Sequence, residues 1–316
     1  MKFLTSIPLK KQTRNLIDYK ARILLLGSCF SENIGNKLNY FKFQQLQNPF
    51  GILFHPKAIE QFITNVINGK TFTKEDLVYQ NERYHSFNAH SSLSEVDENM
   101  ILNNLNSQIS TTQNFLENTT HLIITLGTAW VYRFIETDKI VTNCHKVPQK
   151  KFLKELLDIT EITNSLETIV SLMNSINPNI TILFTVSPVR HLKDGFMQNT
   201  QSKSHLISAI HEVVNVRKNV HYFPSYEIMM DELRDYRFYA EDMIHPNKTA
   251  IKYIWQRFIE VWLAENMTST LKEVDIIQKG IAHKPFNATS EEHKEFLQNL
   301  SLKKKLIISK YPHIKF

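Results

Sequence analysis

Four short apolar runs most constrain the fold of this chain. Each has the length and hydrophobic character of a strand buried on both faces of a parallel sheet. Amphipathic stretches of helical period alternate with them. The apolar runs are residues 23–26, 121–126, 180–186 and 220–223, and the amphipathic stretches are residues 31–41, 161–176, 203–216 and 247–263. This alternation predicts a doubly wound α/β fold, whose ligand crevice lies beyond the carboxyl ends of the strands.

Two segments carry more chain than a minimal α/β unit needs. Residues 131–135 and 139–142 flank a Thr137-Asp138 turn and predict a β-hairpin insertion. Residues 43–118 form a long connection with a turn at its start, and such connections in compact domains are often functional. Beyond about residue 267 the sequence becomes charged amphipathic helix, which predicts a helical extension.

Composition excludes several classes of protein. The net charge of +6 comes from lysines scattered along the chain, so we expect no nucleic acid partner. The only two cysteines, Cys29 and Cys144, form no Cys-x-x-Cys pair, and we expect neither a metal nor another cofactor. No apolar run approaches the ~18 residues of a membrane span, and no signal peptide is evident. We therefore expect a soluble, cytoplasmic protein.

The first candidate for chemistry is the turn Gly27-Ser28-Cys29, which follows an apolar run and precedes a predicted helix. A helix N-terminus stabilises negative charge through its free N–H groups, so a thiol there should have a lowered pKa. The alternative is that Gly27 and Ser28 only make a tight turn, while Cys29 is a small buried hydrophobic residue.

The second candidate is the pair Asp242 and His245, just before the last long predicted helix of the α/β part. An aspartate three residues before a histidine can orient the imidazole through Nδ1–H, leaving Nε2 to take a proton from a nucleophile. Alternatively, Asp242 caps the helix and His245 is a surface residue. The catalytic interpretation of an Asp-x-x-His pair is favoured when a nucleophile-like turn begins the same α/β pattern.

These motifs resemble the GSCFA family, which is named for a Gly-Ser-Cys-Phe-Ala motif and grouped with the SGNH (GDSL-like) hydrolases. This chain has Gly27-Ser28-Cys29-Phe30-Ser31, so only the last letter differs. The resemblance covers roughly residues 20–265 and implies a three-layer α/β/α sandwich with a flavodoxin-like parallel sheet. Residues 1–266 would form the catalytic domain, with residues 267–316 packing on it. Further family-like stretches are residues 48–51, 125–130, 185–191 and 242–247.

The resemblance also implies roles for residues. Cys29 stands where the superfamily has its serine nucleophile, and Ser28, where it has aspartate, is the alternative nucleophile. Gly51 would supply a backbone N–H to the oxyanion hole. This chain departs from the third conserved block of the superfamily, because Gly127-Thr128-Ala129-Trp130 lacks the usual asparagine donor of the oxyanion hole. Loss of such a donor typically lowers the rate about 10²–10³-fold. Another group could replace the asparagine, and the candidates are Asn48, Asn88 and His90.

Arg190 and His191 follow a strand end, where they could hold an anionic or sugar substrate. Alternatively, Arg190 only pairs with the following helix. Together the motifs predict an esterase or O-acyltransferase acting on a small-molecule or carbohydrate ester. One rival is a non-catalytic module that binds carbohydrate or acyl groups on a degenerate fold. The other is a redox-sensing thiol at Cys29, which would need no Asp242–His245 pair.

Overall fold

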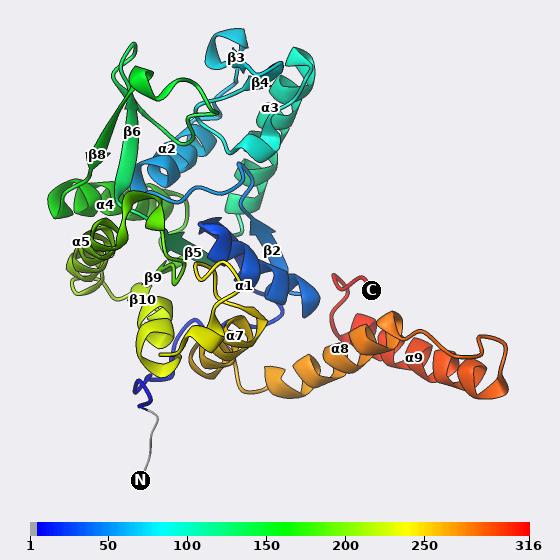
Figure 1. Cartoon of the computed structure of the whole chain (residues 1–316). Helices are drawn as coiled ribbons and strands as arrows, with labels where there is room; N and C mark the ends of the chain where they lie inside the picture. The colour runs from blue at the N-terminus through cyan, green and yellow to red at the C-terminus, as the bar shows by residue number, and fades with distance from the viewer. Residues whose placement is uncertain (1–4) are drawn as a thin grey trace.

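The computed structural model describes residues 5–316 and confirms a doubly wound α/β sandwich (Figure 1). Five parallel strands form the central sheet in the order β2-β1-β5-β9-β10. Numbered along the chain, this is the flavodoxin-like order 2-1-3-4-5. The strands are β1 (Arg22–Gly27), β2 (Gln44–Gln47), β5 (His121–Leu126), β9 (Thr181–Val186) and β10 (Val220–Tyr222). The first four residues of the predicted catalytic domain lie outside the described residues.

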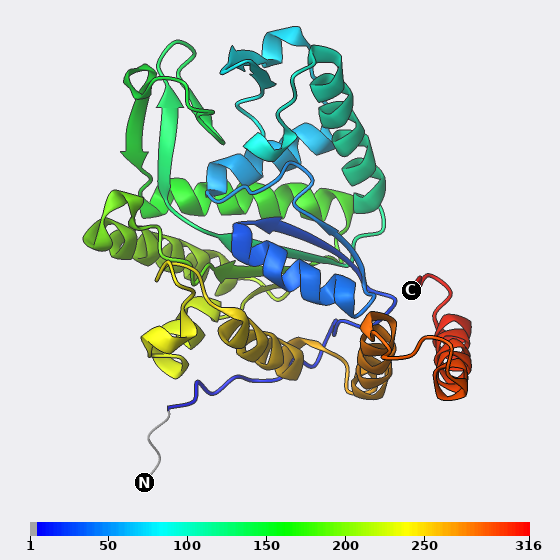
Figure 2. The same cartoon turned by 45° about the vertical axis from the view of Figure 1, so that its right-hand side comes forward.

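Strand β1 shows why the sheet needs helices on both faces. Its side chains alternate, so that Leu24 and Leu26 lie in one buried core while Ile23 and Leu25 lie in another. The first core packs under α2 (Pro56–Ile67), α3 (Glu98–Leu116), α4 (Ile159–Ile176) and α5 (Phe196–Val214). The second packs under α1 (Cys29–Tyr40) and α7 (Lys248–Trp262). Both layers are visible when the molecule is turned (Figure 2).

The edge strand β2 was not predicted from the sequence. Its residues Gln-Gln-Leu-Gln pair in parallel with β1, from Arg22 opposite Gln44 to Leu25 opposite Gln47. All four are only partly buried. A strand at the edge of a sheet can remain polar, so it lacks the apolar run that marks the four central strands.

The predicted hairpin insertion is confirmed and is larger than expected. Strands β6 (Trp130–Phe134) and β7 (Lys139–Val141) form it, and β8 (Phe152–Leu156) adds a third strand beside β6. A second hairpin, β3 (Val78–Gln80) with β4 (Arg83–His85), lies in the long connection. Phe87 joins the two insertions. Its carbonyl accepts the N–H of Thr142 at 2.8 Å, and its ring lies 4.8 Å from that of Phe134.

The C-terminal segment forms two helices, α8 (Met267–Ala282) and α9 (Glu291–Lys310). Leu271, Val274 and Ile277 of α8 are buried in the same core as α1 and α7. At the end of α1, the Tyr40 hydroxyl donates to Asp275 Oδ1 at 2.9 Å. The division at residue 266 remains a prediction. Within residues 5–316, no helix has both the length and the apolar character needed to cross a bilayer.

Candidate active site

The turn after β1 is held so tightly that only glycine fits at its start. Gly27 has φ +137°, and a Cβ placed on it would lie 2.2 Å from the Thr125 carbonyl oxygen. The N–H of Ser28 donates to the same oxygen at 3.0 Å. Ser28 then caps α1, because its Oγ accepts the N–H of Phe30 at 3.3 Å. Cys29 is therefore the first residue of α1, at the carboxyl edge of the sheet where the parallel strands end.

Cys29 and Ser28 differ in burial. Ser28 is 1% exposed and already bonded, whereas Cys29 is partly exposed. Burial raises the pKa of the Cys29 thiol, and the negative charge of Glu32 raises it further. The charge of Lys203 and the N–H groups of Cys29 and Phe30 lower the pKa, but by less. The expectation of a lowered thiol pKa is therefore wrong, because desolvation outweighs the helix N-terminus.

Asp242 and His245 form the hydrogen-bonded pair that the sequence predicted. Asp242 Oδ2 lies 2.7 Å from His245 Nδ1, and Oδ1 accepts the N–H groups of Ile244 at 2.9 Å and His245 at 3.0 Å. These bonds, the backbone N–H of His245 first, lower the pKa of Asp242 to about 2. Asp242 does not cap α7, since Asn247 does so by accepting the N–H groups of Thr249 and Ala250.

The loop that carries this pair is tied to the end of β9. Arg190 donates its N–H to the Ile244 carbonyl at 3.2 Å. In both views the loop before α7 lies beside the N-terminal end of α1 (Figures 1 and 2). His245 Nε2 makes no hydrogen bond to any residue from 5 to 316, and no bond joins it to Ser28 or Cys29. The structure thus brings the two segments to one edge and leaves the Nε2 atom free.

Gly51 does not present a free N–H, which corrects the expectation drawn for it. Its N–H donates to the Asn48 carbonyl at 2.7 Å and closes the turn. Asn48 Oδ1 accepts the Gly27 N–H at 3.0 Å, while Asn48 Nδ2 is buried without a partner among the described residues. His90 packs on this turn, because a Cβ on Gly51 would lie 2.5 Å from the His90 Cβ. Asn48 therefore has a spare donor where Gly51 has none.

The remaining polar residues of the long connection have local partners. Asn88 Nδ2 donates to Ser86 Oγ at 3.5 Å. His85 Nδ1 lies 2.6 Å from Ser94 Oγ, and its ring stacks on His145 at 4.6 Å. His90 Nδ1 accepts the Ser92 N–H at 3.2 Å, and burial lowers the pKa of His90. Among residues 5–316, no three His, Cys, Asp or Glu side chains are grouped as metal ligands.

The loop Gly127-Thr128-Ala129 is held by backbone and helix contacts and offers no side-chain amide. The N–H groups of Gly127 and Thr128 both donate to the Phe54 carbonyl, at 2.7 and 3.1 Å. The N–H of Ala129 donates to Ser202 Oγ of α5 at 2.7 Å. The missing third-block donor is therefore not replaced from within this loop.

Lys203 is a functional candidate that the sequence reasoning missed. It is 1% exposed, and its Nζ donates to the carbonyls of Gly127 and Ser187, both at 2.7 Å. Burial lowers its pKa to about 7. The signal was present: Lys203 lies three and seven residues before Leu206 and Ile210, on the buried face of α5. Lysine is rarely found among the apolar residues of a buried helix face, so its position in the sequence indicates a special role.

Arg190 and His191 lie at the end of β9, as predicted, but in different surroundings. The Arg190 guanidinium stacks on Tyr239 at 4.1 Å and lies 5.3 Å from the Tyr236 ring, so it does not pair with the helix that follows it. His191 Nε2 is buried against Gly127, where an added Cβ would lie 3.0 Å away. Burial, then the charges of Lys203 and His245, lower the pKa of His191 to about 3.

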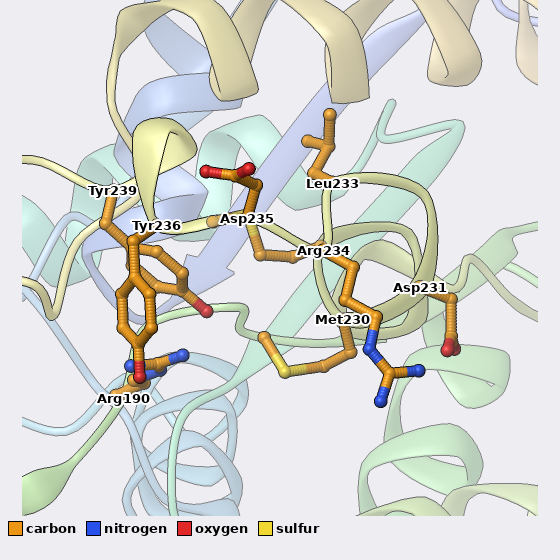
Figure 3. Close-up of a pocket in the computed structure, with 9 residues that line it drawn as sticks. Arg190, Met230, Asp231, Leu233, Arg234, Asp235, Tyr236 and Tyr239 are labelled. Carbon is orange, nitrogen blue, oxygen red and sulfur yellow. The ribbon is translucent and has the colours of Figure 1, made fainter. Parts of the chain in front are cut away.

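Arg190 and the two tyrosines line a cavity of about 370 Å³ (Figure 3). In the close-up the tyrosine rings lie side by side against the Arg190 guanidinium, and Arg234 projects from the other side. Tyr239 also pairs with Pro246, one residue after His245. The cavity therefore adjoins the loop that carries the Asp242–His245 pair. Its other lining residues are Met229, Met230, Asp231, Leu233 and Asp235.

The topology and the residues gathered at the carboxyl edge define a flavodoxin-like α/β protein, a class that binds ligands beyond the carboxyl ends of its strands. The chain belongs to the GSCFA family, whose model matches residues 22–258. A second model, the C-terminal domain of GSCFA domain proteins, matches residues 274–316. The sequence-based recognition of the family is thus confirmed.

Solved structures give only distant matches. Family 3 carbohydrate esterases from Clostridium thermocellum and Talaromyces cellulolyticus are similar at TM-scores of 0.38 and 0.37 and identities of 10% and 9%. The matches cover 80% of this chain and 97% and 99% of those chains. A mutant acetyl esterase with acetate ion has a TM-score of 0.37, 8% identity, and coverage of 80% and 99%. A search of curated proteins found no match. We draw no functional conclusion from scores this low.

Proposed function

We propose that the protein is an SGNH-like esterase or O-acyltransferase, in which Cys29 attacks an ester carbonyl, His245 moves the proton and Asp242 orients His245. The observation that supports this most is the 2.7 Å contact between Asp242 Oδ2 and His245 Nδ1. It fixes the tautomer that leaves Nε2 as the proton acceptor. The loop that carries it lies at the same sheet edge as the start of α1 (Figure 2).

Exposure favours Cys29 over Ser28 as the nucleophile. The Ser28 hydroxyl is buried and serves as a helix cap, so attack through it would break the start of α1. The thiol of Cys29 is partly exposed, but its raised pKa keeps it protonated at neutral pH. A base is therefore required at the moment of attack, which is the role we assign to His245.

The proposed reaction has two steps. In the first, Cys29 Sγ bonds to the ester carbon while His245 Nε2 takes the thiol proton; the alcohol then leaves with that proton, giving a thioester. In the second, His245 deprotonates water or a sugar hydroxyl, which attacks the thioester and releases Cys29. The backbone N–H of Cys29 at the start of α1 and the spare Nδ2 of Asn48 would receive the oxyanion.

The cavity beside Arg190 is the proposed site for the alcohol part of the substrate. Its volume of about 370 Å³ falls in the range of small-ligand pockets. Tyr236 and Tyr239 offer ring faces, and Arg190 offers hydrogen-bond donors. Such a combination suits a carbohydrate ester, since rings pack on sugar C–H faces while guanidinium N–H groups bind hydroxyl or acid oxygens.

The test measures turnover of p-nitrophenyl acetate and of an acetylated sugar by Cys29→Ala, Ser28→Ala and His245→Ala. Cys144→Ser is the matched control, because Cys144 lies in the hairpin insertion. We expect Cys29→Ala and His245→Ala to lose at least about 10³-fold in kcat, and the control to match the wild type. Full activity of folded Cys29→Ala and Ser28→Ala proteins would contradict the proposal.

Two rivals give different results in the same series. A non-catalytic module would turn over no ester, and every variant would still bind the sugar ester. A redox-sensing thiol would react with peroxide at a rate that His245→Ala leaves unchanged. The raised pKa of Cys29 weakens this second rival, because peroxide reacts with the thiolate.

A further inference from the structure

Among residues 5–316, Lys203 is the only lysine that is fully buried, and it has no role in the proposed reaction. It belongs to α5, and its side chain crosses the ends of two central strands. The carbonyls that it binds, Gly127 and Ser187, belong to the first residues after β5 and β9. Lys203 therefore joins the two loops that border the crevice on one side.

The backbone places this ammonium group close to Cys29. The N–H of Ser28 donates to the Thr125 carbonyl of β5 at 3.0 Å, and the N–H of Ser187 donates to the Leu126 carbonyl at 2.8 Å. The ends of β1, β5 and β9 are thus adjacent, and neighbouring strands lie about 4.8 Å apart. Lys203 Nζ, bonded over β5 and β9, is then within roughly two strand spacings, about 10 Å, of the first residue of α1.

No carboxylate is paired with Lys203 among residues 5–316. Both of its partners are neutral carbonyls, and the Tyr226 ring lies 5.8 Å from Nζ. Burying an unpaired ammonium group is costly, and an apolar side chain of similar length could fill the same space. Two carbonyl bonds hold the amine in place, and without a paired carboxylate its charge is free to act on a negative charge that forms nearby during function.

We propose that Lys203 is a positioning residue that holds the Gly127 and Ser187 loops and, as a cation, favours the thiolate of Cys29. The assignment rests on the proposed function only in making Cys29 a nucleophile; the effect on the thiol itself does not require ester chemistry. The same cation would favour the anionic tetrahedral intermediate, which a neutral loop without the usual asparagine cannot do alone.

The charged groups around the pair set the sign of the effect. Glu32 of α1 opposes thiolate formation, and Lys203 favours it. His191 stays neutral near pH 7 because its pKa is lowered to about 3. Since the pKa of Lys203 is about 7, its charge is present below that pH and fades above it. His245, which acts on His191, His90, which is acted on by Glu32, and Tyr226, whose ring lies 5.8 Å from Lys203 Nζ, are further titratable groups of this region.

The test follows alkylation of Cys29 in full-length Cys144→Ser protein as a function of pH. Lys203→Met should slow the reaction with iodoacetamide below about pH 7, where Lys203 carries its charge, and should change the rate little at pH 9, where it does not. The slowing is about tenfold for each unit by which the thiol pKa rises. Lys193→Met is the matched control, because Lys193 is an exposed lysine next to α5. An unchanged pH profile in folded Lys203→Met protein would overturn the proposal.

A second measurement needs no change at Lys203 and covers the case in which Lys203→Met does not fold. A nearby cation speeds reaction with iodoacetate, an anion, relative to neutral iodoacetamide. We expect the ratio of the two rates to fall as pH rises through about 7, and to do so also in His245→Ala, which removes the neighbouring imidazole. A ratio that stays constant would refute the assignment.

These readouts separate failure of this proposal from failure of the proposed function. If Lys203→Met leaves the alkylation of Cys29 unchanged, the Lys203 proposal is overturned, even when Cys29 is essential for ester turnover. Conversely, Cys29→Ala protein with full esterase activity refutes the nucleophile, while the alkylation profile of Cys29 can still depend on Lys203.

Discussion

Replacing Asp242 by asparagine tests the proposed acid-base pair with little disturbance of the fold. Asparagine Oδ1 can still accept the N–H groups of Ile244 and His245, which lie 2.9 and 3.0 Å from the aspartate oxygen. Its amide group then faces His245 Nδ1, where the carboxylate oxygen lies at 2.7 Å. Because an amide N–H donates, Nδ1 must accept, and the ring proton moves to Nε2.

That shift of the ring proton removes the base. In serine proteases the same aspartate-to-asparagine change lowers kcat about 10⁴-fold, and we expect a loss on the order of 10³–10⁴ here. This corresponds to about 4 to 5.5 kcal/mol of transition-state stabilisation. Stability should change by less than about 0.5 kcal/mol, because the Asp242 and His245 side chains are 45% and 48% exposed.

The measurement is kcat for p-nitrophenyl acetate, with thermal melting to confirm the fold. Asp97→Asn is the control, since Asp97 also accepts a backbone N–H, that of Met100, but does so as the cap of α3. Asp242→Ala combined with His245→Ala should be no slower than His245→Ala alone, because the two residues act as a unit. Asp242→Asn protein that keeps more than a tenth of wild-type kcat would refute the assignment of Asp242 and of the tautomer.

Two further predictions concern stability. Burial lowers the pKa of His55 to about 4, so its neutral form stabilises the fold fully above pH 6.5, and this is lost as pH falls towards 4. By urea unfolding, the wild type should lose about 3 kcal/mol more stability over that range than His55→Asn, which keeps the helix cap. Equal losses in the two proteins would contradict it. Gly27→Ala should cost at least about 3 kcal/mol by the same assay, because its Cβ meets the Thr125 carbonyl at 2.2 Å; near-native stability would contradict it.

The central sheet was predictable because burial on both faces leaves an apolar run in the sequence. The strand at residues 121–126 is buried at every position, and its pattern is clear. Strand β2 has three glutamines in four residues and lies at the edge, so no such pattern exists. Strand β8 was missed for a related reason, since its Phe-Leu-Lys-Glu-Leu sequence mixes exposed and buried positions.

Contacts in the candidate site were predictable where both partners lie in one short segment of the sequence. The bonds between Asp242 and His245 span three residues, so their spacing alone indicates the contact. The thiol pKa of Cys29 depends instead on how much chain covers it, which spacing does not report. The role of Lys203 depends on two loops 60 residues apart meeting over α5, as its bonds to Gly127 and Ser187 show.

The order of the proposed catalytic parts along the chain has a consequence for its synthesis. Cys29 emerges early from the ribosome, whereas His245 follows more than 200 residues later. A nascent chain therefore carries the thiol long before it carries the imidazole that would deprotonate it. Under the proposed mechanism, ester hydrolysis begins only once α7 has docked, so chains that end before His245 would be inert towards esters.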